Sequence, residues 1–189
     1  MKIGVFGGLF DPPHIGHLII AQHVFEEFHL HRILFVPSGN PPHKLNYSPY
    51  QSRYAMTELA IAGNENFMIS NIESSISDTT YTIETVRALS KEKTDELYLM
   101  IGSDQWMEIE TWKDPEELFR ECRIVVMRRP HYEITKESKF LDRIMISTAP
   151  LIDVSSTIIR SRIRKDLSVR YLVESRVYDY IKSNNLYKT

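Results

Sequence analysis

Short apolar runs alternate with longer amphipathic stretches along most of the chain. The clearest runs read KIGVF, RILFVP, ELYLMI and RIVVM, and runs of this kind between turn residues are typical of buried strands. Apolar residues that recur every fourth position, such as Ile20, Val24 and Phe28, predict helices between the runs. We expect strands over residues 2–6, 32–37, 67–72, 96–101, 123–127 and 143–147. We expect helices over 15–29, 50–63 and 81–91, one that begins at Asp114-Pro115, one after Ser155-Ser156, and a last one around 173–181.

This alternation of strands and helices predicts an α/β fold. Its sheet is expected to be doubly wound and mostly parallel, with helices on both faces. We expect a single domain over residues 1–189, in which residues 155–189 form a small C-terminal helical part. Ligands bind such sheets beyond the carboxyl ends of the strands. The segments that follow the expected strand ends are 7–17, 37–44, 102–104 and 128–130.

Composition and charge argue against several classes of protein. Hydrophobic residues make up 42% of the chain and charged residues 25%, as in ordinary globular domains. The formal net charge of −2 does not fit a strongly basic nucleic-acid binder, so no nucleic-acid partner is expected. The single cysteine, Cys122, excludes an intramolecular disulfide and a cysteine-built zinc site. Because the sequence shows neither a membrane-length apolar run nor a signal peptide, we expect a cytoplasmic protein without a membrane partner.

The segment after the first expected strand carries the most specific chemistry. It reads GGLFDPPHIGH from Gly7 to His17 and joins a strand to a helix. Paired glycines let the backbone approach a ligand, and a helix N-terminus offers unpaired N–H groups and a partial positive charge, which together favour an anion. His14 and His17, three residues apart, project from one side of the first helical turn, and Gly16 leaves room for a phosphate. The segment matches neither the P-loop pattern nor the G-x-G-x-x-G pattern.

Two histidines at this spacing have simpler interpretations when they stand alone. They can cap a helix or lie on its surface, and they can bind a metal, although no third ligand stands nearby in the sequence. The surrounding residues change this balance, because the whole segment resembles the G-G-[TS]-F-D-P-x-H-x-G-H signature of the nucleotidyltransferase superfamily. Leu9 is a departure: the family usually has Thr or Ser there, so a side-chain hydroxyl contact is lost.

A second segment, from Ile152 to Arg160, resembles the superfamily motif I-S-S-T-x-I-R. Hydroxyl and N–H groups of residues 155–157 stand at the start of a second expected helix, where an anion is favoured. Arg160, one turn later, can reach the same anion and hold it through two hydrogen bonds. An ordinary N-cap followed by a solvated basic face is the alternative when this motif stands alone.

Further matches cover essentially the whole chain and point to one family, the bacterial nicotinate-nucleotide adenylyltransferases. Close matches are P-P-H-K at 41–44, I-G-x-D at 101–104 and R-P at 129–130. Looser matches are TYTIET at 80–85 for S-Y-T-x-D-T, TWK at 111–113 for K-W-Y, and NLY at 185–187 for G-L-Y. The resemblance implies a Rossmann-like fold and transfer of the adenylyl group of ATP to nicotinate mononucleotide, which gives deamido-NAD and pyrophosphate in NAD biosynthesis.

The resemblance also implies roles for individual residues. The implied catalytic residues, which stabilise charge on the phosphates, are His14, His17, Lys44 and Arg160. The implied ATP-binding residues are Gly7, Gly8, Leu9, Phe10, His14, His17, Gly102, Asp104 (on a ribose hydroxyl), Ser155, Ser156, Thr157 and Arg160. The implied acceptor-binding residues are Lys44, Thr80, Tyr81, Thr82, Trp112 (stacked on the pyridine ring) and Arg129. The protein is assigned no metal ligand, and Mg²⁺ is expected to arrive with ATP.

Several alternatives stay open at this point. Asp104 also fits a helix N-cap, Lys44 a solvated loop lysine, and Trp112 a core or interface tryptophan. The chain also fits another adenylyl- or cytidylyltransferase of the superfamily, with phosphopantetheine or a small phosphorylated alcohol as acceptor, or a non-catalytic nucleotide-binding module. The sequence decides neither whether the chain forms a homo-oligomer nor how strictly it selects nicotinate over nicotinamide.

Overall fold

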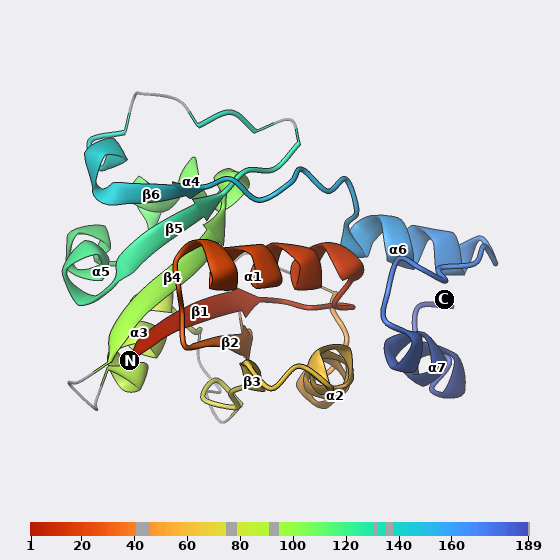
Figure 1. Cartoon of the computed structure of the whole chain (residues 1–189). Coiled ribbons are helices and arrows are strands. Elements are labelled where there is room, and N and C mark those ends of the chain that lie inside the picture. Colours follow the sequence, from red (N-terminus) through yellow and green to blue (C-terminus); the bar gives the residue numbers. More distant parts are fainter. Residues whose placement is uncertain (41–45, 75–78, 91–94, 131, 135–137, 189) are drawn as a thin grey trace.

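The computed structural model contains one six-stranded sheet (Figure 1). It describes residues 1–40, 46–74, 79–90, 95–130, 132–134 and 138–188. The strands are β1 (Lys2–Gly8), β2 (Arg32–Pro37), β3 (Phe67–Ile69), β4 (Glu96–Gly102), β5 (Arg123–Met127) and β6 (Ile144–Ser147). Their order in the sheet is β3-β2-β1-β4-β5-β6, and every neighbouring pair is parallel. The predicted mostly parallel α/β sheet is therefore confirmed, and it has the strand order of doubly wound nucleotide-binding folds.

Helices cover both faces of this sheet (Figure 1). They are α1 (Ile15–Glu27), α2 (Tyr50–Ile61), α3 (Thr82–Leu89), α4 (Ser103–Trp106), α5 (Pro115–Glu121), α6 (Ser156–Arg164) and α7 (Ser175–Ser183). Two short 3₁₀ turns, η1 (Ile109–Thr111) and η2 (Leu141–Arg143), lie between strands β4 and β6.

Alternation along the strands divides the core into two layers. In β4, Leu99 and Ile101 pack into a cluster with α3 and α5, whereas Tyr98 and Met100 pack into a cluster with α1 on the opposite face. Successive strand residues point to opposite faces, so a strand that is apolar on every residue must be covered on both sides. This requirement explains why the runs over 32–37 and 123–127 form strands with the predicted bounds.

A third apolar cluster lies beside the sheet, where α2 meets α6 and α7. Its buried residues include Met56 of α2, Ile159 of α6 and Val177 of α7. Figure 1 shows α6 and α7 to one side of the sheet, near the start of α1. The assignment of residues 1–189 to one domain, with 155–189 as its helical part, stays a prediction. In the part of the chain that the structure describes, no helix is both long and apolar enough to cross a membrane.

The structure differs from the sequence predictions mainly at the ends of elements. β3 ends at Ile69 rather than at residue 72, and α4 was not predicted because its four residues show no periodicity. Pro115 does begin α5, but Asp114 adopts a left-handed conformation with φ of 49°, and its side chain does not cap the helix. Ser155 does cap α6, because its hydroxyl accepts the Ile158 N–H at 3.2 Å.

Candidate active site

The carboxyl ends of β1 and β4 form the place in this sheet where a ligand is expected. β2 and β4 lie on opposite sides of β1, so the loop that follows β1 and the loop that follows β4 lead away from each other at this edge. Residues after β1, β4 and β5 meet there: His14 lies close enough to Arg129 for their charges to interact, and Arg129 contacts Asp104. The Ser38 N–H donates to the Gly8 carbonyl at 2.9 Å, so the described part of the segment after β2 lies there too, and all four strand-end segments named from the sequence are represented.

The two glycines that end β1 serve different purposes. A Cβ placed on Gly7 would meet no atom within 4 Å, so open space lies beside this residue. A Cβ on Gly8 would lie 3.0 Å from the ring of Phe10, which is buried and left-handed with φ of 50°. Gly8 therefore permits the tight return of the chain after β1, and Gly7 leaves its backbone accessible.

The His14 and His17 rings stack face to face at the start of α1. Their centroids are 3.6 Å apart and their planes differ by 23°. The backbone N–H of His14 donates to Nδ1 of the His17 ring at 3.1 Å. A neutral His17 ring therefore carries its proton on Nε2. His14 is only 8% exposed, and its Nδ1 is buried with no hydrogen-bond partner in the described part of the chain.

His14 is uncharged at neutral pH in this setting. Burial first, and the positive charge of Arg129 second, lower the pKa of His14 to about 4. A Cβ on Gly16 would press on the His14 ring at 3.1 Å and on Ile152 at 3.2 Å. The space expected to hold a phosphate at Gly16 is thus filled by the His14 ring, and the glycine is needed for that reason.

The N-terminus of α1 offers fewer free N–H groups than the sequence suggested. The Ile15 N–H donates to the carbonyl of Leu172 at 2.9 Å, and the His17 N–H donates to the carbonyl of His14 at 2.9 Å. Together with the bond from the His14 N–H to the His17 ring, three of these groups are already satisfied within the chain. An anion at this helix end therefore meets fewer available N–H groups than an open helix N-terminus offers.

The second motif lies directly against the first. The Ser156 hydroxyl donates to the carbonyl of Pro12 at 2.8 Å, and Nη1 of Arg160 donates to the carbonyl of Asp11 at 2.7 Å. Nη2 of Arg160 also contacts the Thr157 hydroxyl at 3.3 Å. The expected two-bond contact of Arg160 with an anion is therefore not preformed, although a guanidinium has five N–H donors and keeps others available.

Asp104 and Arg129, which the resemblance assigned to different substrates, form one ion pair. Nε of Arg129 lies 3.2 Å from Oδ1 of Asp104. A Cβ on Gly102 would lie 2.2 Å from Oδ1 of Asp104 and 2.5 Å from Nε of Arg129, so only glycine leaves room for this pair. Gly102, not Asp104, precedes the first residue of α4, so the N-cap alternative for Asp104 is wrong.

Three of the proposed acceptor residues, Thr80, Tyr81 and Thr82, lie at the start of α3, whereas Arg129 lies with Asp104. Thr80 is buried and its N–H donates to the Asn40 carbonyl at 3.1 Å, while Tyr81 directly precedes the helix. Lys113 lies with its Nζ 4.4 Å from the centre of the Tyr81 ring and forms an ion pair with Glu84 at 2.6 Å.

The residue before this lysine, Trp112, is half-buried against the apolar cluster that contains α3. The structure thus brings Trp112 near the 80–82 segment, and part of its ring is committed to packing. Lys44, with the rest of P-P-H-K, lies outside the described residues.

Sequence reasoning missed a buried arginine that holds the loops of this edge. Arg53 of α2 is fully buried. Its guanidinium donates to the carbonyls of Leu9 at 3.1 Å, Ser38 at 2.7 Å and Ser48 at 2.9 Å. Its position with Met56 and Ala60 on the apolar face of α2 was the available signal, because a charged residue on such a face needs buried acceptors.

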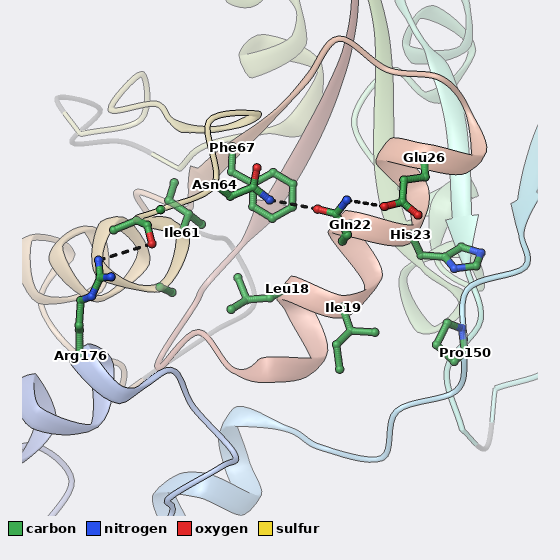
Figure 2. Close-up of a pocket in the computed structure, with 13 residues that line it drawn as sticks. Leu18, Ile19, Gln22, His23, Glu26, Ile61, Asn64, Phe67, Pro150 and Arg176 are labelled. Atoms are coloured by element: carbon green, nitrogen blue, oxygen red, sulfur yellow. Dashed lines mark hydrogen bonds between the residues drawn. The ribbon is translucent and has the colours of Figure 1, made fainter.

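A cavity of about 710 Å³ lies away from this edge, along the outer side of α1 (Figure 2). Leu18, Ile19 and Gln22 of α1 line it together with Asn64 after α2 and Arg176 of α7. Its lining includes no residue of either motif, nor Asp104, Trp112 or Arg129. We therefore assign the chemistry to the strand ends, where the polar groups converge, and not to this cavity.

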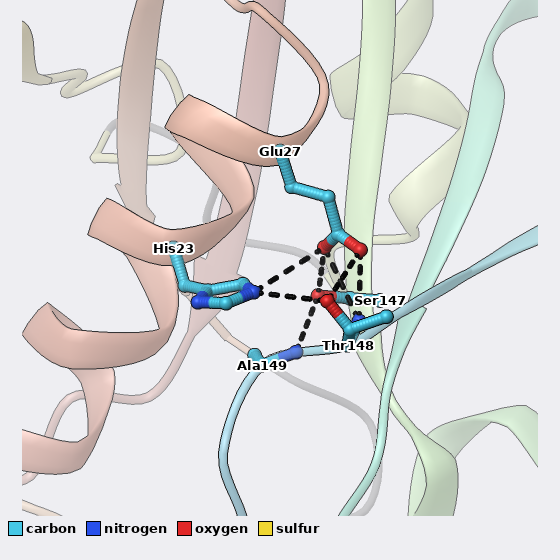
Figure 3. Close-up of polar contacts among 5 residues, drawn as sticks. All are labelled: His23, Glu27, Ser147, Thr148 and Ala149. Atoms are coloured by element: carbon cyan, nitrogen blue, oxygen red, sulfur yellow. Dashed lines mark hydrogen bonds and ion pairs between the residues drawn. The ribbon is translucent and has the colours of Figure 1, made fainter.

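A carboxylate on α1 anchors the connection that leads to the second motif (Figure 3). Glu27 accepts hydrogen bonds from the Ser147 hydroxyl at 2.6 Å and from the Thr148 N–H at 2.9 Å, and His23 contacts the Thr148 hydroxyl at 3.1 Å. Burial alone raises the pKa of Glu27, but the hydrogen bonds from Ser147 and Thr148 lower it overall. Helix α1 thus carries the first motif at its start and, near its other end, holds the segment that leads to the second motif.

Comparisons with known proteins identify the family of this chain. The cytidylyltransferase-like family model matches residues 5–162. A probable nicotinate-nucleotide adenylyltransferase of Rubrobacter xylanophilus is 40% identical, over 100% of this chain and 92% of that protein. One of the same name from Thermus thermophilus is 37% identical over 100% of both chains. This chain belongs to the nicotinate-nucleotide adenylyltransferase family. It is a nucleotidyltransferase, and the predicted family and enzyme class are confirmed.

Solved structures of this family share the fold. Nicotinic acid mononucleotide adenylyltransferase of Plasmodium falciparum, complexed with NaAD, matches with a TM-score of 0.84 and 21% identity, over 98% of this chain and 97% of that one. Its complex with APC matches with a TM-score of 0.82. The predicted Rossmann-like architecture of this adenylyltransferase family member is thereby confirmed.

Proposed function

We propose that the β1–β4 edge transfers the adenylyl group of ATP to the 5′-phosphate of nicotinate mononucleotide, giving deamido-NAD and pyrophosphate. Family membership supports the reaction, and the convergence of the two motifs carries the assignment to this edge. Ser156 and Arg160 bind the carbonyls of Pro12 and Asp11, so both phosphate-binding segments face one region beside the stacked histidines. The reaction places the protein in NAD biosynthesis, and a cytoplasmic location stays a prediction.

The chemistry requires positioning and charge stabilisation rather than a protein base. The attacking phosphate is already an anion, so the enzyme must align it with the α-phosphorus and stabilise charge that moves onto pyrophosphate. His17 donates from Nε2 to the triphosphate, because its Nδ1 already accepts a hydrogen bond from the backbone N–H of His14. Uncharged His14 holds the His17 ring by stacking. The open backbone at Gly7 and the residues up to Phe10 bind phosphate oxygens.

The remaining residues bind the two nucleosides and the leaving group. Ser155, Thr157 and Arg160 bind the β- and γ-phosphates, for which Arg160 turns unused N–H donors toward the ligand. Asp104 accepts from the ribose of ATP and is oriented by its ion pair with Arg129. Mg²⁺ would arrive as part of the ATP substrate and would neutralise charge on the triphosphate; the described residues include no cluster of His, Cys, Asp and Glu that could hold it.

The acceptor is proposed to bind near the start of α3. Trp112 stacks on the pyridine ring, and the backbone at Tyr81 and Thr82 meets the nicotinate carboxylate. Lys113, with its Nζ 4.4 Å from the Tyr81 ring, is already paired with Glu84, so recognition of the carboxylate is assigned to the backbone and not to this lysine. A pocket built from donors disfavours the amide form, because the amide brings an NH₂ donor instead of an acceptor.

One assay tests the reaction. Pyrophosphate release is measured with ATP and nicotinate mononucleotide, and in parallel with nicotinamide mononucleotide, with phosphopantetheine, and with CTP in place of ATP. We expect the first pair to give the highest kcat/KM. A higher value for phosphopantetheine or for CTP would assign the chain to another transferase of the superfamily, and ATP binding without turnover on any acceptor would refute the proposal.

A further inference from the structure

Asp11, in the middle of the first motif, has a role that the reaction itself does not use. The residue is 1% exposed, so its carboxylate cannot meet a ligand in solvent. Oδ1 accepts a hydrogen bond from the Tyr187 hydroxyl at 2.6 Å, and Oδ2 accepts one from the Ser48 N–H at 3.1 Å. A buried carboxylate with two donors on it is fixed in orientation, because losing either donor leaves an oxygen unsatisfied.

The backbone around Asp11 is held on both sides as well. The Leu9 carbonyl accepts from Arg53, the Asp11 carbonyl from Arg160, and the Pro12 carbonyl from Ser156. Between them, Phe10 adopts a left-handed conformation with φ of 50°, which is strained for a residue with a side chain. Such a conformation persists only where surrounding contacts determine it. Each contact on residues 9–12 therefore helps to fix the position of His14.

Tyr187 contributes its contact from the opposite end of the sequence. It follows α7, and its ring packs against the cluster formed by α2, α6 and α7. The packed ring gives the hydroxyl a defined position, with Met56 Sδ 3.8 Å away. Burial and the negative charge of Asp11 raise the pKa of Tyr187, so the hydroxyl stays protonated and donates. Tyr187 is the last residue of the NLY match at 185–187, and its contact with Asp11 gives that match a structural role.

We propose that Tyr187 is a positioning residue for adenylyl transfer, acting through Asp11 to fix the loop between the β1 glycines and His14. The inference rests on the proposed function. It predicts that the Tyr187 hydroxyl affects the rate at which bound substrates react more than it affects their binding, because a small displacement of the loop misaligns the reacting groups.

The test compares two single-atom changes in the same apolar cluster. Tyr187→Phe keeps the ring and removes the donor to Asp11. Tyr180→Phe is the matched control, because Tyr180 also packs against this cluster but its hydroxyl does not hydrogen-bond to Asp11 in the described part of the chain. We measure kcat, both KM values and the thermal midpoint of each variant, with kinetics well below the lower midpoint. We expect kcat to fall roughly tenfold for Tyr187→Phe, with KM for ATP changed less than kcat, and to stay near wild type for Tyr180→Phe.

A purely structural role gives a different result. In that case Tyr187→Phe lowers the thermal midpoint but retains the wild-type kcat while folded, and the proposal is overturned. Adding Asp11→Ala, which removes the acceptor, completes a double-mutant cycle, in which the two changes are expected to be non-additive; additive losses would contradict action through Asp11. If Asp11→Ala does not fold, the comparison of the two phenylalanine variants decides alone. Failure of the wild-type chain to release pyrophosphate would instead contradict the proposed function.

Discussion

The buried His14 makes a quantitative prediction about acid stability. Its pKa is about 4 in the folded chain, against 6.5 for an unperturbed histidine. Between these two values the unfolded chain binds a proton at this residue and the folded chain does not, so the free energy of unfolding falls as the pH is lowered. A difference of 2.5 pKa units corresponds to about 3 kcal/mol, of which about 2 kcal/mol is lost between pH 7 and pH 4.5.

Chemical denaturation separates this contribution from those of other groups. Urea unfolding is measured at about pH 7 and pH 4.5 for the wild type, for His14→Asn and for His29→Asn, which changes an exposed histidine and serves as the matched control. We expect His14→Asn to lose about 2 kcal/mol less than the wild type over this interval, whereas His29→Asn behaves as the wild type does.

Nuclear magnetic resonance provides an independent measurement of the same quantity. The His14 ring resonances should show no titration midpoint above about pH 5 in the folded protein. A midpoint between pH 6 and 7, or an identical pH dependence of stability in all three chains, would refute the reasoning from burial and the Arg129 charge.

Three further changes test the site. His17→Ala should lower kcat by roughly two to four orders of magnitude with little loss of thermal stability, and near-normal turnover would contradict its contact with the triphosphate. Gly102→Ala should raise KM for ATP, because its Cβ would lie 2.2 Å from Oδ1 of Asp104 and break the ion pair with Arg129; an unchanged KM would argue against Asp104 as the ribose ligand. Trp112→Ala should raise KM for nicotinate mononucleotide and leave KM for ATP unchanged, and equal effects on both substrates would argue for a packing role instead.

The sequence predicted the sheet well because its strands are buried on both faces. A run such as RIVVM has no polar alternation, and this composition suits only a strand with helices above and below it. The ends of elements were less predictable. Gly8 and Gly102 are the last residues of β1 and β4, although the sequence indicated that these strands end before them. A Cβ on Gly8 would press on the Phe10 ring where the chain turns back, and a Cβ on Gly102 would meet Asp104 and Arg129.

The motifs indicated which residues belong to the site but not how they contact one another. Ser156 and Arg160 bind carbonyls of residues about 150 positions earlier in the chain, and no local pattern encodes a contact of that separation. The ion pair of Asp104 with Arg129 was missed for the same reason. Arg53 was missed because its place on the apolar face of α2 shows that it is buried but not which carbonyls it binds.

The loop from Leu9 to Pro12 depends on partners that the ribosome makes much later. Ser156, Arg160 and Tyr187 reach it across 144, 149 and 176 positions of sequence. During translation, β1 and α1 leave the exit tunnel long before these three residues are synthesised. Until then, the loop between β1 and α1 lacks most of its hydrogen bonds. Any truncated product that stops before α6 therefore carries an intact HxGH signature and an unformed catalytic edge.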